Sequence, residues 1–390
     1  MNLAEIDSMP DLMLTQGGPG DALLHHLRLA QPQSHTGSRR EALMLAAITL
    51  VPLCLFAMLE GLAFRRVTIP FFDDIATHVR FLVAVPILIL ADVPIGARLR
   101  QVARQFLIAG IVRDKDAPRY GEIVTSALKL RDSRVAELAL FGLAYLATYQ
   151  AMKGVTHSGH TWFRPAADLT PVGYWYAFVS LPIWMFLIWR WIFREVVWSR
   201  FLWQVSKIDL FLTPAHPDSA GGLGFLGKGL IPFGIVAFAI SSVTCGSAAS
   251  RIIFSGARLE DFQSAFIVLA ILMLVVFVGP LMVFAPTLIN LRQTGLLRYG
   301  ILASRYTELF DTKWVESALA TDDRILGTED IQSLGSLGDS YDMIRRMRLV
   351  PLEISDFIAL VLPTVIPALP LLLTVVPLKV ILSQLFRLIA

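Results

Sequence analysis

The sequence predicts an all-α protein, a polytopic membrane bundle of about seven transmembrane helices with proline-broken segments and cytoplasmic helix extensions. Hydrophobic residues make up 55% of the 390 residues and charged residues only 17%, whereas ordinary soluble domains are about 25% charged. Seven apolar runs reach or approach the roughly 20 residues that a helix needs to cross a bilayer. Lysine and arginine gather in alternate segments between these runs, a pattern typical of multi-pass membrane proteins.

The apolar runs give the order of the predicted spans. They cover residues 42–64, 80–97, 135–152, 173–193, 229–249, 264–291 and 354–376. The seven runs leave eight segments, counting the two chain ends, and Arg80 and Arg190 are counted with the segments next to their runs. The first, third, fifth and seventh of these segments hold 25 of the 34 Lys and Arg residues. Because cytoplasmic segments retain Lys and Arg, we expect a multi-pass protein of the cell membrane, of the bacterial inner-membrane kind, with a cytoplasmic N-terminus.

The predicted organisation is a flexible cytoplasmic tail over residues 1–41 and a single transmembrane bundle over residues 42–390, with cytoplasmic segments 98–134, 194–228 and 292–353. The tail contains no long apolar core, so it does not resemble a signal peptide. The net charge of +3 is small. Its concentration just inside the membrane favours contact with anionic phospholipid, and no nucleic-acid partner is expected. Two cysteines inside predicted spans, Cys54 and Cys245, exclude a disulfide framework.

Two acidic residues fall in or beside the first two spans. Glu60 ends the first span, and Asp92 lies in the second between two prolines that predict a kink. A carboxylate at mid-span costs at least about 2.5 kcal/mol on insertion scales, so it normally faces a polar interior or a partner. One interpretation is that both residues line a pathway for cations or protons. The other places Glu60 at the outer interface beside Arg65, and Asp92 within reach of Arg98.

The fourth span is rich in tryptophan and ends in arginine. Trp184, Trp191 and Trp198 recur every seven residues and so share one helical face. Arg190 and Arg194 share another face at the inner boundary. This pattern is typical of an interfacial anchoring belt with snorkelling arginines. The alternative is that both arginines belong to a positively charged ring that selects anions.

A loop between the fourth and fifth spans, residues 213–228, is the most unusual part of the sequence. Two prolines end the incoming helix, and several glycines free the backbone before the next helix begins. Consecutive amides at a helix start form a ready anion site, so we predict an anion- or headgroup-binding or gating loop. The residues are His216, Asp218, Gly221, Gly222, Gly224 and Lys228. The alternative is a sharp re-entry turn that Asp218 caps; Gly229 after Lys228 excludes a P-loop.

Three further segments carry weaker signals. His157 and His160 form an H-x-x-H pair in an outer loop, which could supply two metal ligands but lacks a third His or any Cys. The small residues of the fifth span favour either close helix packing or a water-filled path. Three prolines in the seventh run and a fourth directly after it, Pro377, predict a broken helix that either spans the membrane or re-enters it.

No catalytic motif appears in a place where it could act, so neither enzymatic activity nor a cofactor is predicted. The favoured function is a homo-oligomeric ion channel or pore that contacts the lipid bilayer and passes a small ion or solute. One alternative is a secondary transporter coupled to protons or cations through Glu60 and Asp92. Another is a protein or enzyme that binds a lipid headgroup at the 213–228 loop.

Overall fold

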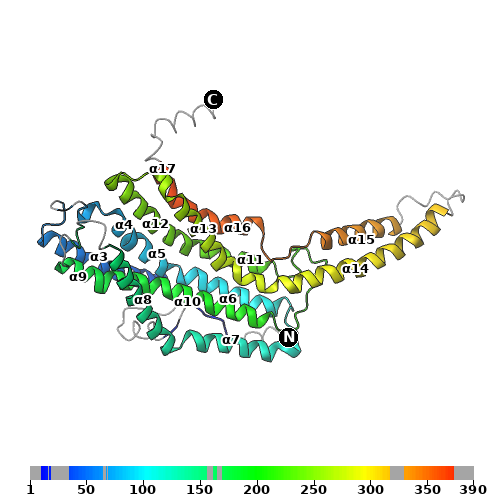
Figure 1. Cartoon of the computed structure of the whole chain (residues 1–390). Coiled ribbons are helices and arrows are strands. Elements are labelled where there is room, and N and C mark those ends of the chain that lie inside the picture. Colours follow the sequence, from blue (N-terminus) through cyan, green and yellow to red (C-terminus); the bar gives the residue numbers. More distant parts are fainter. Residues whose placement is uncertain are drawn as a thin grey trace.

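The protein is an all-α bundle, as the sequence predicts. The structure is a computed structural model that describes residues 10–15, 17–18, 35–64, 67, 69–155, 161–164, 169–316 and 329–372. These residues form helices joined by short connections and contain only isolated β-bridges (Figure 1).

Seven helical segments of the described chain are long and apolar enough to cross a membrane, and each contains or overlaps one predicted span. They are Gly37–Leu59, Ile75–Ile108, Arg134–Lys153, Pro171–Val205, Phe225–Ser255, Leu259–Val315 and Ile354–Leu371. The helical order and the number of spans are therefore confirmed, and the chain is a multi-pass membrane protein.

Besides the 57-residue Leu259–Val315, two of these segments are much longer than a bilayer. Ile75–Ile108 combines α4 (Ile75–His78), a π-helical turn, α5 (Val85–Leu90) and α6 (Asp92–Ile108), with an interruption at Ala91 where a kink was predicted. Pro171–Val205 combines α9 (Pro171–Trp175), a second π-helical turn and α10 (Leu181–Val205). At 1.5 Å per residue each is about 50 Å long, against about 30 Å of hydrocarbon. We call the end of the bundle at which α6 and α10 finish the basic end.

The centre of the bundle is α12, Gly234–Ser255, the most buried of the spans. It packs against α4 and α16 (Ile354–Val365). The hydroxyl of Ser241 donates to the carbonyl of Thr364 at 2.5 Å, and a Cβ at Gly246 would lie only 3.2 Å from Val79 Cβ. The small residues of this span therefore allow close helix packing, which was one of the two predicted roles.

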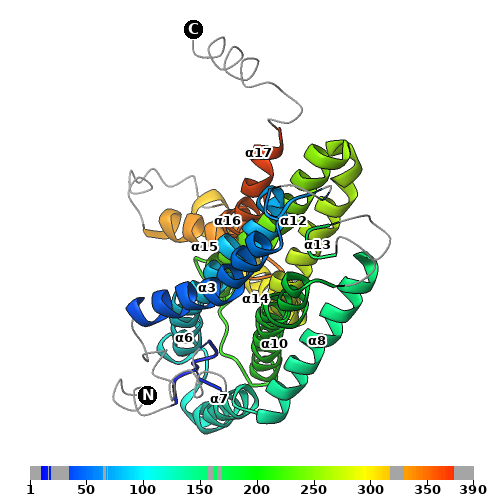
Figure 2. The same ribbon diagram turned by 90° about the vertical axis from the view of Figure 1, so that its left-hand side faces the viewer.

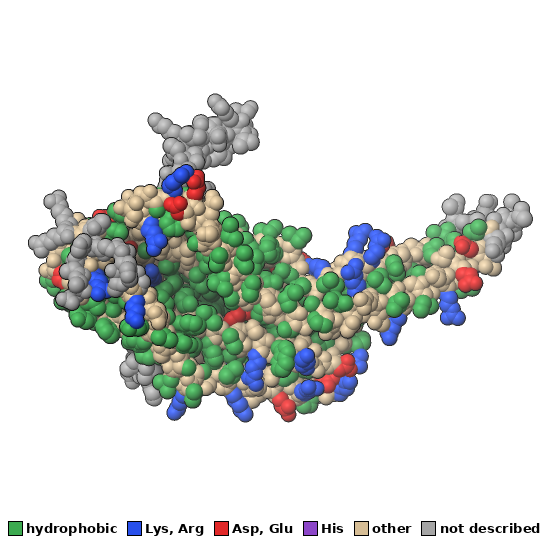
Figure 3. All heavy atoms as spheres, viewed as in Figure 1, with side chains coloured by type: hydrophobic (Ala, Val, Ile, Leu, Met, Phe, Trp, Pro, Cys, Tyr) green, Lys and Arg blue, Asp and Glu red, His purple; other side chains and the backbone are tan. Residues whose placement is uncertain are grey.

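A two-helix arm projects from the basic end (Figures 1 and 2). It consists of α14 (Ala285–Phe310) and the antiparallel α15 (Glu329–Arg345), and it follows α13 (Gln263–Val278) through a 3-10 segment, Gly279–Phe284. The proline-rich last span is likewise broken, since a 3-10 turn at Ile366–Ala368 separates α16 from α17 (Leu369–Leu372). Apolar side chains cover the middle of the face seen in Figure 3, whereas Lys and Arg gather along its lower edge and on the arm.

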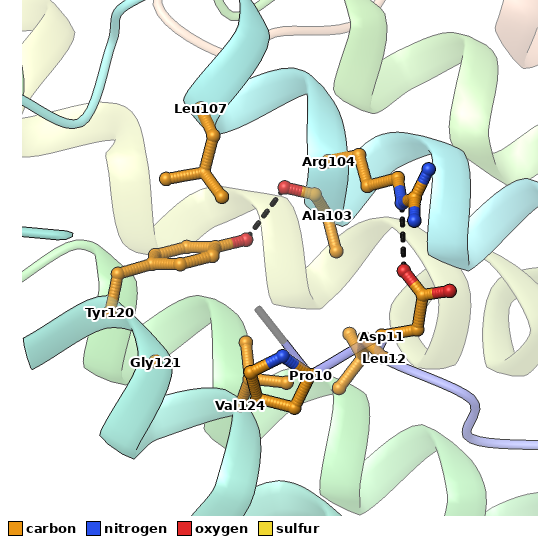
Figure 4. Close-up of a pocket in the computed structure, with 9 residues that line it drawn as sticks. All are labelled: Pro10, Asp11, Leu12, Ala103, Arg104, Leu107, Tyr120, Gly121 and Val124. Carbon is orange, nitrogen blue, oxygen red and sulfur yellow. Dashed lines mark hydrogen bonds and ion pairs between the residues drawn. The ribbon is translucent and has the colours of Figure 1, made fainter. Parts of the chain in front are cut away.

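The N-terminal segment differs from the flexible tail predicted for residues 1–41. Residues 10–15, which we call the strap, lie on the basic end with Leu12, Leu14 and Thr15 buried, and α3 begins at His35. Figure 4 shows the strap against α6 and α7 (Ala117–Arg131), where Asp11 Oδ1 accepts from Arg104 Nε at 2.7 Å. Alternating apolar residues in the strap fill a hollow between these helices, and a composition rich in loop-forming residues elsewhere in the tail concealed this signal.

Candidate functional site

The basic end contains a buried ion pair between α6 and α10. The Arg194 side chain is only 7% exposed. It makes a two-pronged contact with Asp92, in which Nη2 donates to Oδ2 at 2.9 Å and Nη1 donates to Oδ1. The guanidinium also lies 4.9 Å from the ring centroid of Trp191. Asp92 therefore pairs with Arg194 and not with Arg98, whose guanidinium instead contacts Gln101 and the Lys228 carbonyl.

The strap completes this pair. Arg194 Nη2 donates to the Thr15 carbonyl at 2.6 Å, and the Thr15 hydroxyl donates to the Asp92 carbonyl at 2.7 Å. The neighbouring carbonyl of Met13 accepts from Arg131. A buried charge is tolerated only when its remaining donors are satisfied, so the strap contributes directly to the stability of the Asp92–Arg194 pair.

Glu195, the next residue of α10, has no such compensation, and sequence reasoning missed it. Its side chain is 5% exposed, and neither carboxylate oxygen has a hydrogen-bond partner in the part of the chain that the structure describes. The indole N–H of Trp198, one turn later, is also buried and unpaired. Glu195 is the only acidic residue of Pro171–Val205, and that was the available sequence signal. We refer to Asp92, Arg194 and Glu195 together as the buried charge cluster; Asp92 is partly buried at 21% exposure, and no hydrogen bond among the described residues joins Glu195 to the other two.

Arg190 lies one turn before the cluster, in a hollow between the strap, α8 (Arg134–Val155) and α10. Arg131 and Glu137 line the same hollow. The predicted arginine ring would need several subunits, so it remains a prediction.

Glu60 lies at the opposite end of the bundle. Its Oε1 accepts from the backbone N–H of Val172 at 2.9 Å, in the first turn of α9, while Oε2 is buried without a hydrogen-bond partner among the described residues. Arg194, which holds Asp92, is 22 residues beyond Val172 in a continuous helical segment, so the two sites are about 30 Å apart along the helix. The structure does not bring Glu60 and Asp92 together.

The 213–228 loop is closed around the Asp218 side chain. Oδ1 accepts from the amides of Ala220 and Gly222 at 2.8 and 3.1 Å, and Oδ2 accepts from the amide of Gly224 at 2.7 Å. His216 Nδ1 lies 2.8 Å from Oδ1. The amides that were expected to face an anion thus face a carboxylate of the same loop. This closes the sharp turn that the sequence left as the alternative, but the N-cap of the next helix, α11 (Phe225–Leu230), is Gly224 and not Asp218.

The loop is also the joint between the arm and the bundle. The amide of Arg348 donates to the Ser219 carbonyl at 2.7 Å. Gly221 has a φ of +67°, and a Cβ there would lie 2.7 Å from Leu291 Cδ2 on α14. A Cβ at Gly227 would lie 2.5 Å from Asp356 Oδ2. Lys228, for its part, interacts through its carbonyl.

Hydrogen bonding sets the charge state of Asp218. Burial alone would raise its pKa, but hydrogen bonds from the amides of Gly224, Ala220 and Gly222, and the contact with His216, outweigh burial and lower the pKa below its usual value. A depressed folded-state pKa means that the carboxylate stabilises the fold above its unfolded-state pKa. This contribution is lost as the pH falls through the folded-state pKa.

We therefore expect Asp218→Asn to lower stability at pH 7 by about 2 kcal/mol, the scale of a charge-assisted hydrogen bond. The difference from the wild type should begin to shrink below the usual Asp pKa of about 3.9 and should close only as the pH falls through the lowered folded-state pKa of Asp218. Melting followed by tryptophan fluorescence between pH 3 and 7 measures this effect. Asp209→Asn is the matched control, because Asp209 is an exposed partner of Lys115 and such pairs contribute little. Equal melting of D218N and D209N at pH 7 would contradict the capping role.

A second prediction concerns the strap. A Cβ at Gly96 would lie 2.0 Å from Thr15 Oγ1, so Gly96→Val should displace Thr15 from α6. We expect hydrogen exchange of residues 10–15 to become at least about tenfold faster, the change that 1.4 kcal/mol of local stability produces. Gly142→Val is the control, because a Cβ at Gly142 meets nothing within 4 Å. Unchanged exchange in G96V would show that the strap is not held at this contact.

His157 and His160 lie outside the described residues, so the predicted metal pair stays a prediction. Within the described ranges, no group of three or more His, Cys, Asp or Glu residues could hold a metal ion.

Comparisons with protein-family models, curated protein sequences and solved structures find no match.

Proposed function

We propose that this membrane protein transports protons or small cations, and that Glu195 binds the transported ion. One observation carries the proposal: the Glu195 carboxylate is buried in a membrane-crossing segment without a hydrogen-bond partner among the described residues. Burying a polar group in this way is unfavourable. Ionisable residues inside membrane segments are accordingly rare, and they mark ion paths and proton relays.

The charges of the cluster support a singly charged ion. Asp92 and Arg194 neutralise each other through their two-pronged contact. Glu195, the next residue of α10, is not paired with them, so an ionised Glu195 would leave the three residues with one net negative charge, which one proton or one monovalent cation would balance. The proposal retains the cation path predicted near Asp92. In it, however, Glu195 and not Asp92 is the residue that binds the ion.

In this proposal the basic end faces the cytoplasm and the strap closes it. Thr15 contacts both members of the ion pair, so the cluster opens toward the cytoplasm only when the strap leaves. The capped 213–228 loop would transmit motion of the arm to the bundle, because its backbone is bonded to Arg348 at the foot of the arm.

The test is ion flux into liposomes that contain the purified protein. We expect a flux of protons, Na⁺ or K⁺ in the wild type, a faster flux in G96V, whose strap is displaced, and no flux in Glu195→Gln. Glu308→Gln is the control, because Glu308 is exposed on the arm and should leave the flux unchanged. Absence of flux in both the wild type and G96V would overturn the proposal, and so would an unaltered flux in E195Q.

The second candidate is the homo-oligomeric channel that the sequence favours. Its specific support is the face of α14 opposite α15, where Leu297, Ile301 and Leu309 are 70%, 66% and 70% exposed. This face lies beyond the length of a bilayer-spanning helix, so lipid tails would not cover it, and exposed apolar surface of this kind marks interaction sites.

Native mass spectrometry in mild detergent distinguishes the two candidates. The channel candidate predicts an oligomer for the wild type and monomers for the Leu297→Glu, Ile301→Glu double variant. If the wild type is a monomer and still carries flux, the homo-oligomeric channel is excluded and the ion path lies within a single chain.

A further inference from the structure

We infer that the outer surface of the bundle holds one anionic phospholipid of the leaflet at the basic end, in a groove between α10 and the α13–α14 bend. The inference is independent of the transport proposal. Three features of the groove support it: its shape, the order of apolar and basic residues along it, and its depth in the membrane.

The groove lies where α10 packs beside the 3-10 segment that joins α13 to α14. Its walls are Ser199, Arg200 and Trp203 of α10, Val275 and Val276 of α13, and Gly279, Pro280 and Val283 of the 3-10 segment. The 3-10 segment, which contains Pro280, interrupts the regular α-helix. Gly279 has no side chain to fill the groove, and a Cβ at that position would meet nothing within 4 Å.

The polarity along the groove follows that of a phospholipid. On α10, the exposed Ile192 and Val196 are followed one and two turns later by Arg200 and Trp203. On the other wall, Val275 is 63% exposed. An acyl chain therefore fits the apolar part, while a headgroup would meet the guanidinium and the indole.

The basic part of the groove is suited to a phosphate. Among the described residues Arg200 donates one hydrogen bond, from Nη2 to Ser126 Oγ at 3.1 Å, and within that part of the chain its other N–H groups are available to a ligand. Lys207 Nζ lies 5.7 Å from the Trp203 ring centroid and adds a second positive charge. The lining residues of this groove include no carboxylate. Two cations without a counter-charge favour an anionic headgroup over a zwitterionic one.

The depth of the groove agrees with this assignment. α13 begins at Gln263 at the far end of the bundle, and Gly279–Val283 lies 16 to 20 residues further on, about 24–30 Å along the axis. That distance matches the thickness of the hydrocarbon core. Arg200 and Trp203 thus lie at the level of the headgroups, where tryptophan is enriched.

The test is native mass spectrometry of delipidated protein after addition of equal amounts of phosphatidylglycerol and phosphatidylcholine with identical acyl chains. We expect one phosphatidylglycerol per chain, retained about tenfold more than phosphatidylcholine. In Arg200→Gln this preference should fall below about twofold. In Gly279→Leu, whose side chain fills the groove, retention of both lipids should fall. Arg298→Gln is the control, because Arg298 is exposed on the arm.

Each outcome decides the inference. Equal retention of the two lipids by the wild type would overturn it, and so would equal preferences in R200Q and R298Q, which would indicate diffuse surface charge. Because Arg200 is exposed, R200Q is expected to fold, and its melting temperature without added lipid should match that of R298Q. Absence of flux in a wild-type protein that still retains phosphatidylglycerol would count against the transport proposal alone.

Discussion

Replacing Arg194 with alanine is expected to destabilise the bundle by up to about 3–5 kcal/mol, the range for breaking a buried ion pair, because it removes the cation of the Asp92 carboxylate, which is only 21% exposed. The loss should exceed that of a surface arginine, since Arg194 also holds the Thr15 carbonyl. Arg194→Lys should not restore the wild-type stability, because an ammonium cannot reproduce the two-pronged contact together with the bond to Thr15.

A double variant separates the loss of the pair from the burial of an unpaired charge. Arg194→Met with Asp92→Leu removes both charges and fills similar volume, and we expect it to be far more stable than Arg194→Ala. Unfolding can be followed with a thiol-reactive dye, because Cys245 is buried and unoxidised in the fold. If R194A has the same melting temperature as the exposed-site variant R298Q, the ion pair contributes nothing to stability and the described pairing is wrong.

Replacing Glu195 with methionine is expected to increase the stability of the protein, whereas Arg194→Ala lowers it. Methionine has a similar length, lacks polar atoms that need partners and adapts to irregular space. Removing a buried carboxylate that has no hydrogen bond among the described residues should therefore stabilise the protein by about 1–3 kcal/mol, while ion flux is abolished. Such an exchange of stability for activity is the behaviour of a functional group held in an unfavourable place.

The comparison variant for this prediction is Trp198→Phe, which removes the other unpaired polar group of the same helix face without a carboxylate. It should change stability little and preserve flux. If E195M is strongly destabilised and loses its fold, Glu195 has a structural partner, and the ion-binding assignment is wrong.

The sequence predicted the features that depend on local composition. Span length, apolar content and the Lys and Arg distribution gave seven membrane-crossing segments, and the prolines around Asp92 and at 363–370 gave the interrupted second and seventh helices. The Asp218 turn was anticipated as an alternative, because Asp before a Gly-rich helix start is a local capping signal. These features need no knowledge of which helices touch.

The buried charge cluster depends on contacts that the sequence does not display. Asp92 and Arg194 are 102 residues apart in the chain, and Arg98 was a nearer partner in sequence. The strap was missed because its few apolar residues lie in a polar, turn-rich tail. Their burial depends on a hollow made by α6 and α7, which the sequence does not display. Glu195 was passed over because the neighbouring tryptophans and arginines explained the segment as an anchoring belt.

The most direct test of the central claim is a difference infrared titration of the carboxyl C=O band, comparing the wild type with Glu195→Gln in lipid. The transport account predicts a band that changes with pH or on addition of Na⁺ or K⁺ in the wild type and is missing from E195Q. If no band of the wild type that depends on Glu195 responds to pH or to either cation, Glu195 does not bind the ion and the account is contradicted.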